Sequence, residues 1–254
     1  MNHKGKREYL INYLLRERNS FNDVMIPNDD EEQKRLLRSL MNVREGKNID
    51  KEFLNVQDEY LKEVAIEKGI VDINDLKPIK NNIYLWQGDI TRLKCDAIVN
   101  AANSGMTGCY IPCHNCIDNA IHTYAGVELR NYMNDIMMRQ GHEEETGKAK
   151  ISSAYNLPSK YIIHTVGPIV NGSATDEDKK LLKSCYNSCL NIVVENSIKS
   201  IAFCCISTGI FGFPKVDAAK IAVETVEEFN KEIKVVFNVF TDEDYNIYNK
   251  LLCM

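Results

Sequence analysis

Hydrophobic residues recur at helical spacing through about the first eighty residues. The segment REYLINYLLRE (7–17) places its leucine, isoleucine and tyrosine side chains at this spacing, and segments 29–45 and 50–69 repeat the pattern. Acidic residues open the second and third segments, and Gly69 follows the third, as is typical of helix ends. We predict three amphipathic helices in an N-terminal extension over residues 1–79, which packs as a cap on the rest of the chain.

From about residue 80, short apolar runs alternate with longer helical segments. The runs that predict strands are 81–89, 95–103, 148–158, 160–168, 200–207 and 233–240. The segments that predict helices are 116–141, 175–197, 215–232 and 242–252. This alternation favours a mixed or parallel sheet with helices on both faces, in a domain over residues 80–254. Ligands of such sheets bind beyond the carboxyl ends of the strands.

Polar side chains follow several of the predicted strands. Asp89 comes after the first strand, and Asn100 and Asn103 lie at the end of the second. The loop STGIFGFP (207–214) follows a buried strand and precedes a helix, and its glycines allow backbone N–H groups to approach an anion. By itself this loop could be a tight connector. Together the three turns would place a carboxylate, two amides and a phosphate-binding loop along one edge of the predicted sheet.

Composition and charge narrow the class of protein. The 254 residues are 44% hydrophobic and 26% charged, as is usual for a globular protein. The net charge of -5 argues against broad binding to nucleic acid, which needs many cationic contacts to phosphate. The basic N-terminus is not followed by a long apolar run, so we expect no membrane span, no secretion signal and a cytoplasmic location. The 9 cysteines would then be reduced.

Three cysteines and two histidines cluster in GCYIPCHNCIDNAIH (108–122), a pattern typical of metal ligands. From the residues alone, three ligand sets are open. They are Cys109 with His114 and Cys116, Cys109 with Cys113 and Cys116, or all four residues in a closed site. Adjacent side chains tend to diverge, so the four-residue set would be strained. A nucleophilic thiol is the other alternative, but no matching Cys–His–Asn arrangement is apparent.

The helix that follows this cluster carries two further candidates. Asp118 lies two residues beyond Cys116 and could orient or deprotonate an attacking water. His122, one helical turn later, could orient Asp118 or could be a buried structural histidine. His164 lies inside a predicted strand, so we expect it to be structural.

The run GDIT…DAIVNAANSG…CIDNAIH…AG…HTVGP…STGIFGFP…VVFNVF, over residues 80–252, closely resembles the macrodomain family, which binds ADP-ribose. The resemblance implies a three-layer α/β/α fold with a mixed central sheet. Segment 106–116, MTGCYIPCHNC, replaces the glycine-rich segment usual in ADP-ribose-hydrolysing members. It resembles the zinc-containing branch, described as reversing protein mono-ADP-ribosylation and carrying an N-terminal helical extension. The ligand pattern of that branch corresponds to Cys109, His114 and Cys116 as ligands of Zn²⁺, with the fourth coordination position open to water or substrate.

The resemblance also implies roles for the polar turns. Asp89 would bind the adenine amino group, Phe240 would stack on adenine, and Phe211 would press on the distal ribose. Asn103 and Asp118 would act at that ribose as the catalytic pair. The implied substrate-binding positions are Asp89, Ile90, Asn100, Ser207, Thr208, Gly209, Ile210, Phe211, Gly212 and Phe240. For Phe211 and Phe240 the alternative is an ordinary core aromatic.

The predicted function is a zinc-dependent hydrolase that releases ADP-ribose from modified protein side chains, with an Asp or Glu ester as the expected linkage. One alternative is a binding module that recognises ADP-ribose without cleaving it, and another is a deacetylase of O-acetyl-ADP-ribose. In the family, bacterial members often act beside a sirtuin-type ADP-ribosyltransferase and a lipoyl-carrier protein, so we expect such partners.

Overall fold

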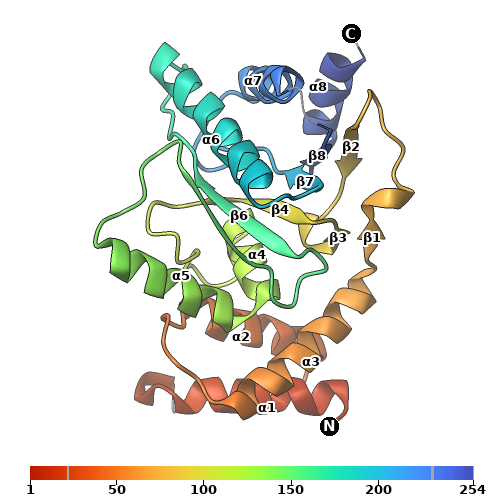
Figure 1. Ribbon diagram of the computed structural model, residues 1–254. Coiled ribbons are helices and arrows are strands. Elements are labelled where there is room, and N and C mark those ends of the chain that lie inside the picture. The colour runs from red at the N-terminus through yellow and green to blue at the C-terminus, as the bar shows by residue number, and fades with distance from the viewer. Residues whose placement is uncertain (22, 230–231, 254) are drawn as a thin grey trace.

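A six-stranded mixed sheet organises the larger part of the chain in the computed structural model (Figure 1), which describes residues 1–21, 23–229 and 232–253. The strand order is β2-β8-β7-β4-β6-β5, and only β5 runs antiparallel to its neighbour. The strands are β2 (Ile83–Gln87), β4 (Ala97–Ala102), β5 (Ala149–Ser153), β6 (Tyr161–Val166), β7 (Ser200–Phe203) and β8 (Lys234–Val239). The predicted mixed sheet is confirmed. Because β2, β8, β7, β4 and β6 are parallel, their carboxyl ends share one edge.

Two strands of two residues were not predicted. They are β1 (Val71–Asp72) and β3 (Leu93–Lys94), which pair with each other in parallel outside the main sheet. Strands this short leave no hydrophobic alternation in the sequence.

Helices cover both faces of the sheet (Figure 1). On one side lie α6 (Asp176–Glu195), α7 (Lys215–Glu228) and α8 (Asp242–Leu252), and on the other lie α4 (Ile117–Ala125) and α5 (Val127–Gln140). This arrangement confirms the three-layer α/β/α fold. The predicted helix 215–232 is shorter in the structure, and its residues 230–231 lie outside the described ranges. Short 3₁₀ turns occur at Asn19–Phe21, Ile73–Asp75 and Ile90–Arg92.

The N-terminal helices form a further layer beyond α4 and α5. They are α1 (His3–Arg16), α2 (Asp30–Val43) and α3 (Lys51–Lys68). The acidic residues that marked two predicted starts are N-caps: the side chain of Asp29 accepts from the N–H of Glu32, and that of Asp50 from the N–H of Phe53. Each bond satisfies one backbone donor that the first helical turn leaves free. The predicted helical extension is therefore confirmed, whereas its boundary at residues 79/80 stays a prediction.

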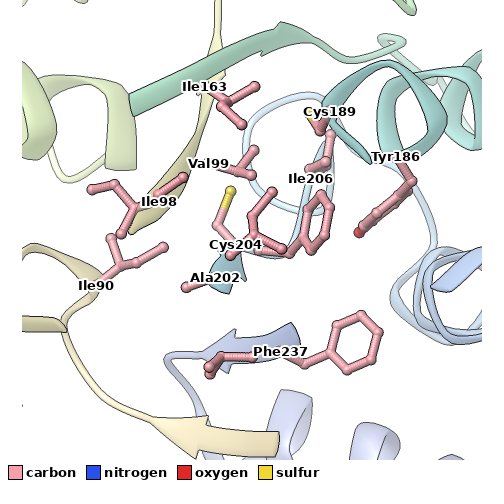
Figure 2. Close-up of a cluster of buried hydrophobic side chains, with 14 of the residues drawn as sticks. Ile90, Ile98, Val99, Ile163, Tyr186, Cys189, Ala202, Cys204, Ile206 and Phe237 are labelled. Atoms are coloured by element: carbon pink, nitrogen blue, oxygen red, sulfur yellow. The ribbon is translucent and has the colours of Figure 1, made fainter. Parts of the chain in front are cut away.

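Two hydrophobic cores match these layers. The larger contains Ile98, Val99 and Ile163 from the central strands together with Phe237 from β8 (Figure 2). The smaller lies among α1, α2 and α3 and includes one residue of α5, Val127. The extension therefore packs its apolar side chains against the domain as well as within itself. No helix in the described ranges is long and apolar enough to cross a membrane.

The prediction of one long helix over residues 116–141 is wrong. Gly126 ends α4 and begins α5 with φ 101° and ψ 172°, a conformation that side chains other than glycine's rarely permit. The break redirects the chain, so that Gln57 of α3 accepts a hydrogen bond from the N–H of Val127 at 2.9 Å. Gly141, the predicted stop, is confirmed as the left-handed C-cap of α5.

Replacing Gly126 with alanine tests this break. A Cβ atom there would lie 2.7 Å from Nε2 of Gln57 in addition to forcing the backbone strain. We expect Gly126→Ala to lower the free energy of unfolding by roughly 2–4 kcal/mol in urea denaturation. The control is Gly141→Ala, which meets no atom within 4 Å and should cost only about 1 kcal/mol. Equal losses in the two variants would contradict this account.

Candidate functional site

A buried carboxylate lies at the carboxyl edge of the sheet. Asp118, in the first turn of α4, is only 5% exposed. Its Oδ1 accepts a hydrogen bond from Nδ2 of Asn100 at 2.8 Å, and its Oδ2 accepts from Nδ2 of Asn103 at 3.3 Å. Burial raises the pKa of Asp118 to about 6, although the Asn100 bond and the charge of Arg130 oppose the rise. The structure thus brings together three of the predicted site residues.

A second contact fixes the amide of Asn100. Its Nδ2 lies 3.1 Å from Nδ1 of His164, whose Nε2 lies 2.8 Å from Oγ of Ser152. Burial lowers the pKa of His164 to about 3, so the ring is neutral at neutral pH. The neutral ring can accept from Asn100 at Nδ1 and donate to Ser152 at Nε2. His164 is thus a buried structural residue, as expected from its strand, but one that holds Asn100 in place.

His122 lies against the same carboxylate without a hydrogen bond to it. Its Nε2 is 3.6 Å from Oδ1 of Asp118, and neither ring nitrogen has a hydrogen-bond partner among the described residues. Burial first, and then the charges of His164 and Arg130, lower the pKa of His122 well below its ordinary value. Gly108 packs on the ring so closely that a Cβ atom would lie 2.7 Å from it. The neutral ring of His122 therefore packs against Gly108 of the cysteine-containing loop.

Cys109, His114 and Cys116 form a group with metal-binding geometry. Their ligand atoms all lie within 4.8 Å of one another, and Sγ of Cys109 is 3.5 Å from Nδ1 of His114. A tetrahedral zinc ion with Zn–S bonds of about 2.3 Å and Zn–N bonds of about 2.0 Å separates sulfur and nitrogen ligands by about 3.5 Å. The donor set and its spacing therefore fit zinc with three protein ligands.

Cys116 also caps a helix, accepting from the N–H of Asn119 at 3.4 Å. The dipole of the helix by itself favours a thiolate at this position. Burial instead raises the pKa of Cys116 to about 12, with the neighbouring Cys109 adding to the rise and the Asn119 bond opposing it. A bound cation would reverse this balance, because metal binding favours the deprotonated thiol.

Cys113 lies outside this group. Its backbone has φ 52°, and its Sγ is turned toward α2, 3.1 Å from Oγ of Ser39. The two ligand sets that contain Cys113 are therefore not assembled in the part of the chain that the structure describes.

Asp89 lies at the end of β2 and is held by three donors. Its Oδ1 accepts from N and Oγ1 of Thr91 at 2.9 and 2.6 Å, and its Oδ2 lies 2.6 Å from Nζ of Lys68. Burial opposes ionisation, but the bonds from Lys68 and Thr91 outweigh it, so the pKa of Asp89 lies below its ordinary value. Lys68 belongs to the last turn of α3, and its ammonium also lies 3.5 Å from the ring centroid of Tyr124. The extension thus contacts the predicted adenine site directly.

The aromatic candidates differ in exposure. Phe240 is 74% exposed at the end of β8, so it is not a core residue, whereas Phe211 is half-buried. Ile90 is buried beside Asp89. A flat, exposed aromatic beside a carboxylate is suited to stacking on a planar ligand.

The loop after β7 leaves backbone donors free. Gly212 donates to the carbonyl of Gly209 at 3.0 Å, which closes a turn around the N–H groups of Ile210 and Phe211. Those two groups have no backbone partner within the described ranges. Ser207 opens the loop with φ 64° and packs against Gly167, where a Cβ atom would lie 2.0 Å from its Oγ. The positive end of α7 follows at Lys215, so the loop is suited to an anion.

Three residues of this site were not predicted from the sequence. They are Lys68, Gly167 and the buried Arg130 of α5. Lysine and arginine are common residues in amphipathic helices. Nothing in the local sequence therefore marks Lys68 or Arg130 as a site residue. The packing of the extension against the domain brings Lys68 to Asp89, whereas the fold of the domain itself brings Arg130 to the cysteine-containing loop.

Comparison with known proteins identifies the family of this chain. A family model described as Macro domain matches residues 99–222. The chain is 57% identical to a "Protein-ADP-ribose hydrolase" of Treponema medium, over 99% of this chain and 100% of that one. It is 50% identical to a protein of the same description from Staphylococcus aureus (strain MRSA252), over 97% and 95% of the two chains. A variant Oceanobacillus iheyensis macrodomain solved with ADPR superposes with a TM-score of 0.63 at 38% identity, over 70% of this chain and 95% of that one. The chain belongs to the Macro domain family.

Proposed function

We propose that this protein is a zinc-dependent hydrolase that removes mono-ADP-ribose from modified protein side chains. The observation that carries the proposal is the position of the buried Asp118, held by Asn100 and Asn103 at the sheet edge where the loop with Cys109, His114 and Cys116 begins. The names of the relatives from Treponema medium and Staphylococcus aureus support the reaction class.

In this proposal, ADP-ribose lies along the carboxyl edge of the sheet. Adenine would stack on Phe240 and donate from its amino group to Asp89. The diphosphate would lie on the free N–H groups of the loop from Ser207 to Gly212. The distal ribose would then reach Phe211 and Asn103, near Asp118. The ADPR in the Oceanobacillus iheyensis structure supports this choice of ligand.

The proposed reaction is hydrolysis of the bond between the anomeric carbon of the distal ribose and an acceptor carboxylate of Asp or Glu. The oxygen of water bonds to the anomeric carbon, the bond to the acceptor oxygen breaks, and the released carboxylate and ADP-ribose share the protons of water. A zinc ion held by Cys109, His114 and Cys116 would act as a Lewis acid on a ribose hydroxyl or water. Asp118 accepts a hydrogen bond from the attacking water and orients it, while the amides of Asn100 and Asn103 fix the carboxylate.

Two thiolate ligands neutralise the charge of a zinc ion, so the centre would be a milder Lewis acid than one with three histidines. This charge balance favours a role in positioning a ribose hydroxyl or water over the generation of free hydroxide. A sirtuin-type ADP-ribosyltransferase and a lipoyl-carrier protein stay predicted partners.

Replacing Asp118 separates hydrolysis from binding. We expect Asp118→Ala to lower the turnover of a mono-ADP-ribosylated protein by about 100-fold or more, because the water loses its acceptor. The Kd for ADP-ribose, measured by calorimetry, should change little because adenine and diphosphate contacts remain. Asp176→Ala, an exposed carboxylate of α6, is the control. Full turnover in the Asp118 variant would show that the catalytic group lies elsewhere, and no turnover in the native protein would favour the binding module.

Removing the metal tests the zinc assignment. The purified protein should contain about one zinc per chain, and a chelator should abolish turnover while ADP-ribose still binds. Cys116→Ser should lose the zinc, whereas Cys113→Ser should keep it because Cys113 faces Ser39. Undiminished turnover in metal-free protein would refute the zinc-dependent reaction.

Lys68→Met tests the contact between the extension and the adenine site. Without the ammonium 2.6 Å from Asp89, the pKa of that carboxyl should rise in an NMR titration, and ADP-ribose should bind roughly two- to fivefold more weakly. Because the pKa of Asp89 is depressed in the folded protein, its contribution to stability is present above the ordinary carboxyl pKa and is lost as pH falls. The stability difference between variant and native protein should therefore shrink below about pH 4.

The matched control is Lys94→Met, which removes a lysine 3.0 Å from Asp72 in the separate two-stranded sheet. It should leave both the pKa of Asp89 and the Kd unchanged. An unchanged Asp89 pKa in Lys68→Met would contradict the assigned contact.

A further inference from the structure

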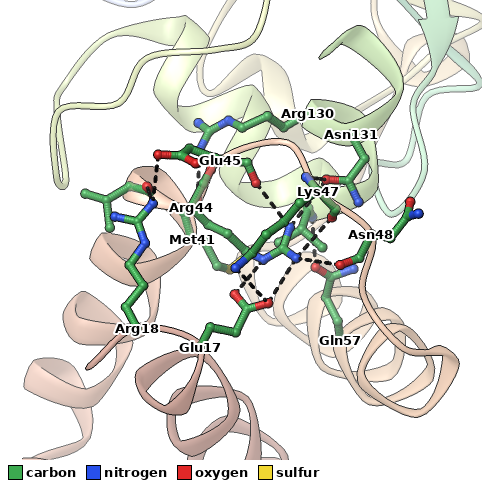
Figure 3. Close-up of polar contacts among 12 residues, drawn as sticks. Glu17, Arg18, Met41, Arg44, Glu45, Lys47, Asn48, Gln57, Arg130 and Asn131 are labelled. Carbon is green, nitrogen blue, oxygen red and sulfur yellow. Dashed lines mark hydrogen bonds and ion pairs between the residues drawn. The ribbon is translucent and has the colours of Figure 1, made fainter. Parts of the chain in front are cut away.

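Arg130 joins the N-terminal extension to the metal loop, defined as residues 106–116. The guanidinium is buried, and its Nε donates to the carbonyl of Thr107 at 2.7 Å, while Nη2 donates to that of Cys109 at 3.3 Å. Nη1 donates to three carbonyls at the end of α2, those of Met41, Asn42 and Arg44, at 3.0, 2.5 and 2.7 Å. Figure 3 shows Arg130 above Met41 and Arg44. One side chain thus fixes the end of α2 relative to a candidate metal ligand.

Arg38 of α2 holds the other end of the metal loop. Its Nη2 donates to the carbonyl of His114 at 2.9 Å, and its Nε and Nη2 both donate to Oδ1 of Asn119, at 3.1 and 2.8 Å. Asn119 in turn donates from its N–H to Sγ of Cys116 and from Nδ2 to the carbonyl of Ile111 at 2.9 Å. Arg38 therefore contacts one ligand residue directly and a second through Asn119.

The middle of the loop is held by the same helix. Oδ1 of Asn42 accepts from the N–H of Cys113 at 2.9 Å, and Nδ2 of Asn42 donates to Oγ1 of Thr123 at 3.0 Å. Asn42 is almost fully buried. Asn42 thus holds the backbone of Cys113 against α2, and Sγ of Cys113 lies 3.1 Å from Oγ of Ser39 on the same helix.

We infer that α2, through Arg38 and Asn42, and Arg130 position the ligands of the metal centre. The N-terminal extension is therefore a structural part of that centre. The inference rests on the proposed metal site at Cys109, His114 and Cys116.

Two physical arguments support it. The metal loop contains no helix or strand of its own, so its ligands would be ordered at an entropic cost on binding unless other contacts ordered them beforehand. In addition, the side-chain hydrogen bonds of Arg38 and Arg130 in the described ranges all go to backbone carbonyls or to the amide oxygen of Asn119. Both side chains therefore hold the backbone that carries Cys109 and His114 in place. Second-sphere partners of this kind typically change metal affinity by roughly 10- to 100-fold.

The test is the zinc Kd of the full chain, measured by competition with a chromophoric chelator. We expect Arg38→Ala to bind zinc roughly 10- to 100-fold more weakly than the native protein, with partial recovery in Arg38→Lys. Arg18→Ala is the matched control, because Arg18 donates to the carbonyl of Val43 on the same helix at 3.0 Å and contacts no residue of the metal loop within the described ranges. Its zinc Kd should stay within about twofold of the native value, a change of about 0.4 kcal/mol. Circular dichroism confirms that each variant is folded at the temperature used.

The absorption spectrum of the Co²⁺-substituted protein adds a second measurement. Its ligand-field bands should shift or weaken in Arg38→Ala because the ligands are less well oriented, and should be unchanged in Arg18→Ala. An unchanged zinc Kd and Co²⁺ spectrum in Arg38→Ala would overturn this inference while leaving the metal centre intact. If Arg38→Ala does not fold, the zinc Kd and the Co²⁺ spectrum of Arg38→Lys are compared with those of Arg18→Ala in the same way, and the same outcomes apply. A native protein that binds no zinc would overturn the proposed metal centre itself, and this inference with it.

Discussion

A carboxylate that is removed from water must be surrounded by donors, and this requirement organises the site around Asp118. Its two oxygens accept from Asn100 and Asn103, which lie on β4 and just beyond it. Asn100 is itself held by His164 of the neighbouring strand. The carboxylate orientation is therefore fixed by adjacent parallel strands and by the first turn of α4. The loop after β7 and the loop after β4, which carries the cysteine group, both begin at this same carboxyl edge.

The N-terminal extension packs against α4 and contacts residues at the same edge of the sheet. Its last helix brings Lys68 to Asp89, and α2 brings Arg38 to the metal loop. These contacts lie at the two ends of the proposed ADP-ribose path. A chain reduced to the sheet and its flanking helices would keep the strands and the anion loop but would lose these cations. If the proposed function holds, the extension is part of the binding site as well as a cap on the domain.

Much of this arrangement can be predicted from local sequence. Acidic helix starts at Asp29 and Asp50, apolar strands and polar turns each depend on neighbours in the chain, so the order of elements and the position of Asn100 and Asn103 at the end of a strand could be anticipated. The place of Asp118 beside these amides was implied only by the family resemblance. The break at Gly126 could not be anticipated, because a glycine within an apolar helical pattern does not reveal its φ angle. Lys68 and Arg130 were missed for a different reason: their partners lie more than twenty residues away in most cases, and only tertiary packing determines them.

The central claim is that a metal ion held by Cys109, His114 and Cys116 has an open coordination position facing the distal ribose of ADP-ribose. The most direct measurement is a crystal structure of the zinc-loaded protein with ADP-ribose, with anomalous scattering recorded at the zinc edge. We predict one strong anomalous peak bonded to those three side chains, with its fourth position directed at the ribose beside Asp118. A peak enclosed by four protein ligands and remote from the ribose, or no peak at the loop, would contradict this account.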